Sequence, residues 1–139
     1  LLKRVIYHEY THALVHRIAG GRCPTWLNEG LAQLMEYKVS PASSEWVDSS
    51  LLKDSQIWPL IDLHGSFLKM DSQEARKAYT QSYFAVQYLA SEYGLSGITG
   101  LLRELGEEGS FDNALKNTMG ISYPTLNERF QAYLVERLW

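Results

Sequence analysis

Apolar residues recur along this chain at the three- and four-residue spacing of helices, and no segment shows the alternation of a half-buried strand. The pattern predicts a mostly α-helical chain, and its length of 139 residues predicts one domain over residues 1–139. The predicted helices cover residues 2–18, a segment opening at 24–25, 71–94, 95–105, 111–117 and 123–138. Residues 39–50 are polar and predict a loop with room for a short helix.

Local residues predict several helix ends. Gly20 and Gly21 end the first helix, and Thr25 has the side chain of an N-cap for the second. Asp71 is followed three residues later by Glu74, which is the spacing of a capping box. We therefore expect a long helix to begin after Asp71 and to end at a glycine, residue 94.

The first predicted helix is unusually apolar. In residues 5–15, VIYHEYTHALV, the only charged or imidazole side chains are His8, Glu9 and His12. A helix that is apolar nearly all round is expected to be buried. Ionisable groups in such a setting need partners, because burying a charge without one is costly.

These three residues form the pattern HExxH. His8 and His12 are four residues apart, so their imidazoles project from one helix face and can converge on a metal ion. Glu29, seventeen residues after His12, is a candidate third ligand, and Gly30 beside it would permit close approach to the first helix. Three protein ligands leave a fourth position open for water, as in catalytic zinc sites. Glu9 would then act as the general base beside the open position.

Simpler interpretations stay open for several of these residues. His8, Glu9 and His12 could be core polar residues satisfied by hydrogen bonds, and Glu29 could serve only the helix dipole. Glu36 is a rival ligand but is expected to be solvated. His16 is interpreted as a polar residue at a helix end, His64 as a loop residue and Cys23 as a free thiol.

Composition limits the function classes. The chain is 45% hydrophobic and 21% charged, which is ordinary for a globular domain. A net charge of −3 provides no basic face, so nucleic acid is an unexpected partner. The single cysteine excludes an internal disulfide and a cysteine-based zinc site, and no apolar run reaches the roughly 18 residues of a membrane span.

The sequence begins abnormally. It has no initiator methionine and no capping residue before its first apolar helix. We therefore expect an N-terminally truncated fragment, in which a missing signal peptide is uninformative about export.

Two segments resemble the gluzincin metallopeptidases, especially the bacterial peptidase-MA-like domains. They are HEYTHALV, residues 8–15, and PTWLNEGLAQLMEY, residues 24–37. Residues 79–89, YTQSYFAVQYL, resemble the tyrosine-bearing helix of the aminopeptidase branch, and residues 93–122 resemble the helical C-terminal part of these domains. The resemblance implies the helical catalytic subdomain of a zincin-like peptidase, whose preceding β-sheet would lie upstream of this sequence.

The resemblance also implies roles for single residues. His8, His12 and Glu29 correspond to zinc ligands, Glu9 to the general base, and Tyr79 to the hydroxyl that stabilises the oxyanion. Tyr83, one turn later, is an alternative donor. Where the thermolysin-like branch has an aspartate that steadies a ligand histidine, this sequence has a glutamine, residue 33.

The sequence therefore predicts a zinc metallopeptidase that hydrolyses peptide bonds with a zinc-activated water. Its expected partner is a peptide or protein substrate, and the oligomeric state stays open. The alternative is a zinc-binding pseudopeptidase or interaction module without turnover. A helical scaffold without metal is a third possibility, which stoichiometric zinc would exclude.

Overall fold

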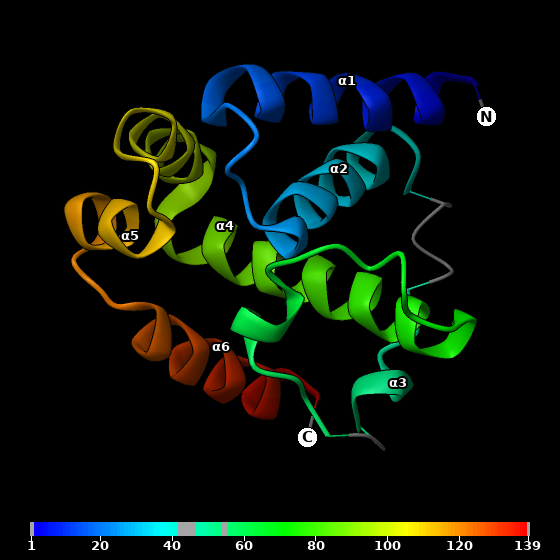
Figure 1. Cartoon of the computed structure of the whole chain (residues 1–139). Helices are drawn as coiled ribbons and strands as arrows, with labels where there is room; N and C mark the ends of the chain where they lie inside the picture. The colour runs from blue at the N-terminus through cyan, green and yellow to red at the C-terminus, as the bar shows by residue number, and fades with distance from the viewer. Residues whose placement is uncertain (1, 42–46, 54–55, 139) are drawn as a thin grey trace.

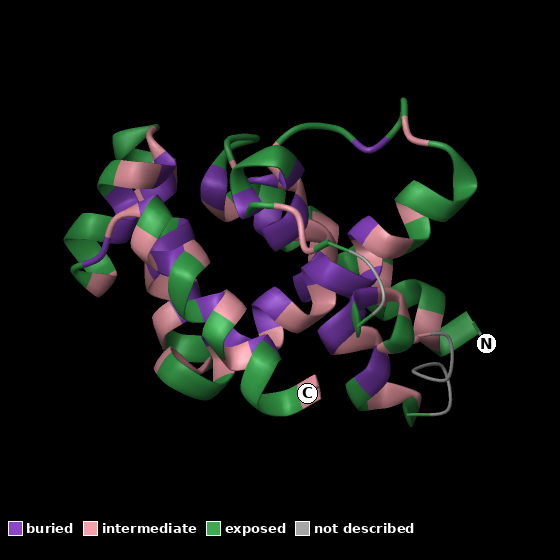
Figure 2. Ribbon diagram, turned by 90° about the horizontal axis from the view of Figure 1, so that it is seen from below, coloured by how far each residue is buried: buried purple, intermediate pink, exposed green. Residues whose placement is uncertain are grey.

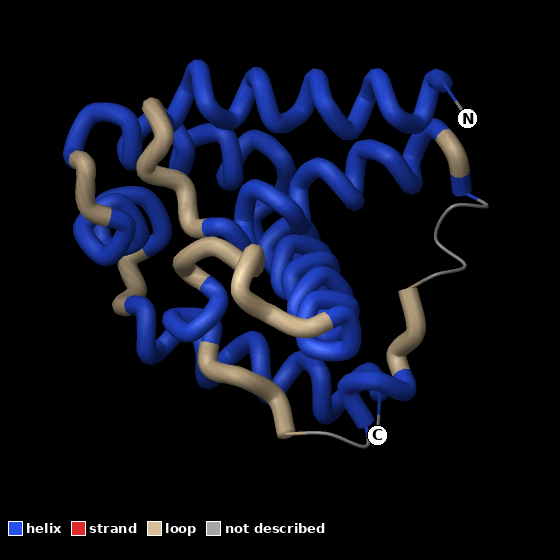
Figure 3. The backbone as a smooth tube through the Cα atoms, turned by 45° about the vertical axis from the view of Figure 1, so that its right-hand side comes forward, coloured by secondary structure: helices blue, strands red, loops and turns tan. Residues whose placement is uncertain are grey.

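The structure is a computed structural model that describes residues 2–41, 47–53 and 56–138. The described residues are mainly helical and contain no strand, which confirms the predicted mostly α-helical class (Figure 3). The elements in chain order are α1 (Leu2–Ala19), α2 (Thr25–Val39), α3 (Ser50–Lys53), the 3₁₀ helix η2 (Leu60–Leu63), α4 (Ser72–Glu108), α5 (Phe111–Met119) and α6 (Tyr123–Leu138).

Helix α2 lies between α1 and α4, and this layering positions the site. In Figure 1, α1 crosses the top of the molecule, α2 runs beneath it, and α4 passes through the centre. α5 packs on the end of α4, and α6 covers its lower side. A residue of α2 can therefore face α1 on one side and α4 on the other.

The core is formed mainly by α2, α4 and α6. Its largest fully buried side chains include Trp26 and Leu27 of α2, Leu101 and Leu105 of α4, and Phe130 of α6. Buried positions face inward on these helices, and exposed positions line their outer surfaces (Figure 2). Burial of such large apolar side chains is the main favourable contribution to folding.

The predicted capping box at the start of α4 is confirmed. The backbone N–H of Glu74 donates to Asp71 Oδ1 at 2.9 Å, and the backbone N–H of Asp71 donates to Glu74 Oε1 at 3.1 Å. Gly94 has a φ of 69° and interrupts the helical backbone. The predicted helices 71–94 and 95–105 are thus both present, as two arms of α4 joined at this kink.

The predicted cap of α2 is wrong. Pro24 occupies the N-cap position, Thr25 is already helical, and no side chain caps this end. Instead, the backbone N–H of Thr25 donates to the carbonyl oxygen of His64 at 2.9 Å. A residue distant in sequence supplies the acceptor, so no local pattern could reveal it.

The predicted burial of α1 is also wrong. Only Val15 and Ala19 of this helix are buried. Its exposed large apolar side chains are Leu2, Val5, Ile6, Tyr7, Tyr10 and Leu14. The helix packs through one face on α2 and α4, and hydrophobicity alone does not tell which apolar residues belong to that face.

Gly30 does permit a close helix contact, but with a different partner from the one predicted. A Cβ atom at Gly30 would lie 2.4 Å from the carbonyl oxygen of Ser82 and 2.4 Å from Val86 Cγ2. Both neighbours belong to α4. The glycine therefore brings α2 against α4, and not against α1.

Candidate metal centre

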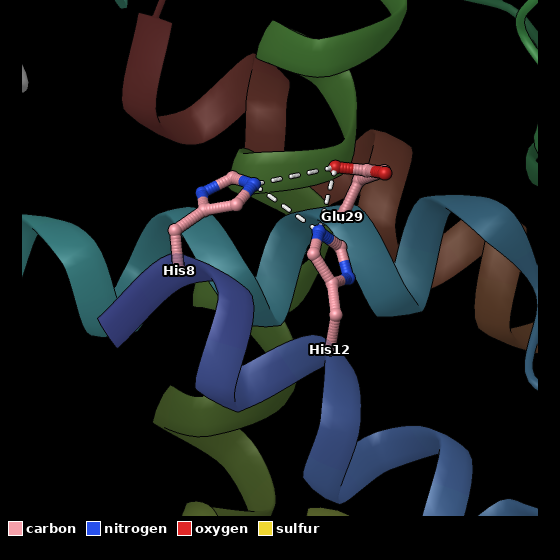
Figure 4. A group of neighbouring side chains, drawn as sticks. All are labelled: His8, His12 and Glu29. Carbon is pink, nitrogen blue, oxygen red and sulfur yellow. Dashed lines mark hydrogen bonds and ion pairs between the residues drawn. The ribbon is translucent and has the colours of Figure 1, made fainter. Parts of the chain in front are cut away.

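Three predicted ligands meet where α1 crosses α2. The Nε2 atoms of His8 and His12 are 3.1 Å apart. Glu29 Oε2 lies 3.5 Å from His12 Nε2 and 4.0 Å from His8 Nε2. Figure 4 shows the two imidazoles rising from α1 toward the carboxylate carried by α2. This is the group of described residues whose donor atoms could hold a metal ion, all lying within 4.8 Å of one another.

The other ring nitrogen of each histidine faces an oxygen. His8 Nδ1 is 2.8 Å from Glu36 Oε1, and His12 Nδ1 is 2.8 Å from Asn28 Oδ1. Because these oxygens accept hydrogen bonds, each Nδ1 carries the proton and donates. The Nε2 atoms are then left with lone pairs that point into the shared space.

The donor set fits a cation. Two lone-pair nitrogens and a carboxylate oxygen crowd one point and repel one another unless a positive charge lies between them. When His12 is protonated, its Nε2 can donate to Glu29, and this hydrogen bond raises the pKa of His12 above its ordinary value against the lowering effect of burial, while Asn28 adds to the rise. Two imidazoles and one carboxylate are typical ligands of Zn²⁺.

Glu36 is not the solvated residue that the sequence predicts. Its side chain is only 12% exposed, and Oε2 forms an ion pair with Arg4 Nε at 3.6 Å. Glu36 follows Glu29 by seven residues, which is two helical turns, so both project from the face of α2 that meets α1. This seven-residue spacing was the sequence signal that could have placed Glu36 beside the site.

Gln33 has a different task from the aspartate that it replaces in the resemblance. Its Nε2 donates to the carbonyl oxygens of Glu29 at 3.3 Å and Tyr79 at 3.0 Å. The side chain therefore joins α2 to α4 and forms no hydrogen bond with a histidine. It is Glu36, and not residue 33, that accepts a hydrogen bond from His8.

A cavity of about 320 Å³ opens beside the three candidate ligands. It is lined by His8, Glu9, His12, Glu29, Gln33, Glu36, Tyr37 and Tyr79. A second cavity of about 160 Å³ adjoins it and shares His8, Glu9 and Glu36. Glu9, the residue after His8 on α1, borders both cavities.

Tyr79 of α4 borders the larger cavity, whereas Tyr83 is not among its lining residues. Burial raises the pKa of Tyr79, and the negative charge of Glu29 raises it further. The hydroxyl is therefore protonated at neutral pH and can donate. The Tyr83 ring packs against Tyr37 with 5.0 Å between ring centroids, on the adjoining part of α2.

The remaining candidates lie outside the cavity. His64 Nδ1 is 3.0 Å from the hydroxyl of Tyr123, which itself accepts a hydrogen bond from Trp26 Nε1 at 2.8 Å. His16 is exposed near the end of α1. Cys23 is a free thiol, as predicted, and burial raises its pKa to about 12.

Of the helices in the described ranges, none is both long and apolar enough to cross a membrane. No solved structure matches this chain. A protein of Bacillus subtilis (strain 168), named "Uncharacterized protein YhcO", is 25% identical over 143 residues. The match covers 94% of this chain and 41% of that protein, so the chain spans about two fifths of its relative's length.

The sequence model of the Peptidase MA superfamily matches residues 2–136, which includes both helices of the candidate site and nearly all of the chain. The protein therefore belongs to the Peptidase MA superfamily.

Proposed function

We propose that this chain carries the catalytic centre of a zinc-dependent metallopeptidase. One observation above all supports the proposal: His8, His12 and Glu29 bring three donor atoms together at the edge of a cavity that Glu9 and Tyr79 also border. Membership of the Peptidase MA superfamily supports the same class of activity. The substrate would be a peptide or protein.

His8, His12 and Glu29 would hold the ion and leave one coordination position open. A zinc ion in such a site activates water and polarises the carbonyl group to be attacked. The residues of the chain hold the donor atoms in place beforehand, because Glu36 and Asn28 fix the two rings through their Nδ1 atoms.

Glu9 is suited to the proton transfers of hydrolysis. Its carboxylate would take a proton from the attacking water as the water oxygen bonds to the carbonyl carbon. The same group would then deliver that proton to the amine nitrogen when the C–N bond breaks. Glu9 borders both adjoining cavities, so a substrate in either one passes its carboxylate.

Tyr79 is suited to stabilise the negative charge that develops on the carbonyl oxygen. Its hydroxyl stays protonated because the raised pKa lies further from neutrality than that of an ordinary tyrosine. A preorganised donor of this kind acts where charge appears in the transition state.

The test is a Glu9→Gln substitution in the full natural protein that carries this chain. We expect unchanged zinc content and a fall in peptide hydrolysis of about 10²-fold or more. Glu128→Gln, at an exposed position of α6, should keep full activity. Undiminished turnover in Glu9→Gln would remove Glu9 from the mechanism, and loss of zinc would make it a ligand. A zinc-loaded wild type without hydrolysis would favour the pseudopeptidase instead.

A further inference from the structure

Arg4 lies one helical turn before His8 on the same face of α1. Its Nε atom is 3.6 Å from Glu36 Oε2, while Glu36 Oε1 is 2.8 Å from His8 Nδ1. One carboxylate thus touches the arginine with one oxygen and the histidine with the other. The three side chains form a continuous row that ends at the proposed metal ligand.

The Nε atom of Arg4 is buried and has no hydrogen-bond partner within the described part of the chain. Its ion pair with Glu36 is the polar contact that the structure shows for it. A buried N–H group without a partner is costly. The position of the Arg4 side chain is therefore explained best by the attraction between its guanidinium and the Glu36 carboxylate.

The charges around the cavities point to the same conclusion. Three carboxylates border the two adjoining cavities, those of Glu9, Glu29 and Glu36. Among the described lining residues, Arg4 is the only lysine or arginine. Without it, the three negative charges would repel one another and push Glu36 toward solvent.

The charges of Arg4 and Glu36 both affect the pKa of Tyr37, the residue that follows Glu36 on α2. Burial, the largest cause, and the negative charge of Glu36 help to raise the pKa of its hydroxyl to about 12, while the charge of Arg4 opposes the rise. Arg4 and Glu36 therefore act with opposite sign on the same part of the cavity wall.

We propose that Arg4 is a positioning residue that acts on His8 through Glu36. It holds the Glu36 carboxylate where that group accepts the Nδ1–H of His8, and this keeps His8 Nε2 directed at His12 and Glu29. The inference rests on the proposed zinc site and adds to it an arginine that makes no contact with the ion. Outer-shell partners of metal ligands change metal affinity by about 10–100-fold when they are removed.

The experiment measures the zinc dissociation constant by competition with a chelator of known affinity. Arg4→Met keeps an apolar stem and removes the charge, and we expect affinity to fall by about 10-fold. Glu36→Gln should lower it by at least as much. The double variant should bind zinc no more weakly than Glu36→Gln alone, because Arg4 has no route to His8 without that carboxylate.

Two further variants isolate the charge of Arg4. Arg4→Lys should restore part of the lost affinity, since it returns a cation but not the guanidinium. Lys3→Met removes an exposed cation at the neighbouring position and should leave the dissociation constant unchanged. Melting temperatures of the metal-free variants show whether each one folds, and Arg4→Lys carries the test if Arg4→Met does not.

Three results would overturn the inference. They are wild-type zinc affinity in the Arg4 variants, losses that multiply in the double variant, and an equal loss in Lys3→Met. A raised KM with unchanged zinc affinity would assign Arg4 to substrate binding instead. A wild-type chain that binds no zinc would contradict the proposed function itself, so the two failures are distinguishable.

Discussion

At the scale of single residues, the site depends on how two imidazole rings are held. Both Nδ1 atoms donate to oxygens of α2, and both Nε2 atoms face the Glu29 carboxylate. The rings are thus oriented before any ion arrives. Such preorganisation lowers the free energy needed to assemble a metal site.

Tyr79→Phe tests the proposed oxyanion donor. The substitution deletes only a hydroxyl, so zinc content and stability should stay close to wild type. We expect kcat for peptide hydrolysis to fall by about 10²–10³-fold with little change in KM, the size typical of losing one such donor. Steady-state kinetics on the full natural protein would measure both constants.

Tyr83→Phe is the matched control. Its ring packs against Tyr37 and Phe84, and it is not among the residues that line the larger cavity, so its loss should be nearly silent. The reverse ranking would transfer the role to Tyr83. Two silent variants would show that neither tyrosine stabilises the transition state.

The residues brought together here could be predicted only in part. His8 and His12 follow from spacing, because an i, i+4 pair on a helix shares a face whatever surrounds it. Glu29 lies on a second helix and follows from the resemblance of residues 24–37. The bonds of Glu36 and Asn28 depend on how α2 is rotated against α1. That rotation is set by tertiary packing, which sequence spacing does not encode.

At the scale of elements, α2 carries the third donor while packing on α4 with its opposite side. Gly30 makes this possible, because any side chain there would meet the backbone of Ser82 and the side chain of Val86. The proposed ligand Glu29 and the helix contact at Gly30 are thus adjacent in sequence. Displacing α2 from α4 would also move Glu29.

Gly30→Ala should destabilise the fold. Its Cβ would lie 2.4 Å from two heavy atoms of α4, one of them a backbone oxygen that cannot move freely. Overpacking of this kind typically lowers the free energy of unfolding by about 1–3 kcal/mol. Urea denaturation of the metal-free chain would measure the change.

Gly100→Ala provides the comparison within α4. A Cβ at Gly100 meets nothing within 4 Å, and alanine is favoured over glycine inside a helix by about 0.5–1 kcal/mol. This variant should match or exceed wild-type stability. Equal denaturation midpoints for Gly30→Ala and wild type would contradict the close packing of α2 on α4.

Features that depend on a few neighbouring residues were predicted better than features that depend on tertiary packing. The capping box of Asp71 and Glu74 acts within four residues, and the structure contains it. The start of α2 and the exposure of α1 depend on His64 and on which helix face is covered. Those are properties of the assembled fold.

At the scale of the whole molecule, a hydrogen-bonded row ties the connector after η2 to α2 and α6. The hydroxyl of Tyr123 accepts from Trp26 Nε1, so its own proton goes to His64 Nδ1. The His64 carbonyl in turn accepts from Thr25 at the start of α2. Protonating His64 Nδ1 would remove the acceptor of this row.

Stability should therefore depend on pH through His64. Burial lowers the pKa of His64 in the folded protein below 6.5, so the unfolded chain takes up the proton more readily. The contribution of neutral His64 is present above about pH 6.5 and is lost as pH falls through the folded pKa. His12 affects stability in the opposite direction. Because its pKa is raised in the folded protein, its stabilising contribution is present below about pH 6.5 and is lost as pH rises through the folded pKa.

His64→Asn separates the two histidines, since an asparagine oxygen can accept from Tyr123 without titrating. When the pH is lowered from 7 to 5, the melting temperature of the metal-free wild type should fall more than that of this variant. His16→Asn, at an exposed position of α1, should follow the wild type. The same pH dependence in wild type and His64→Asn would contradict the assigned role of His64.

The central claim is that His8, His12 and Glu29 form a zinc site. The most direct test is the zinc content of the chain after removal of all metal, reloading with Zn²⁺ and removal of unbound ions. Wild type should retain about one zinc per chain. His12→Ala should lose it, whereas His16→Ala, one turn further along the same helix and exposed, should retain it. Equal zinc in wild type and His12→Ala, or none in wild type, would contradict the account.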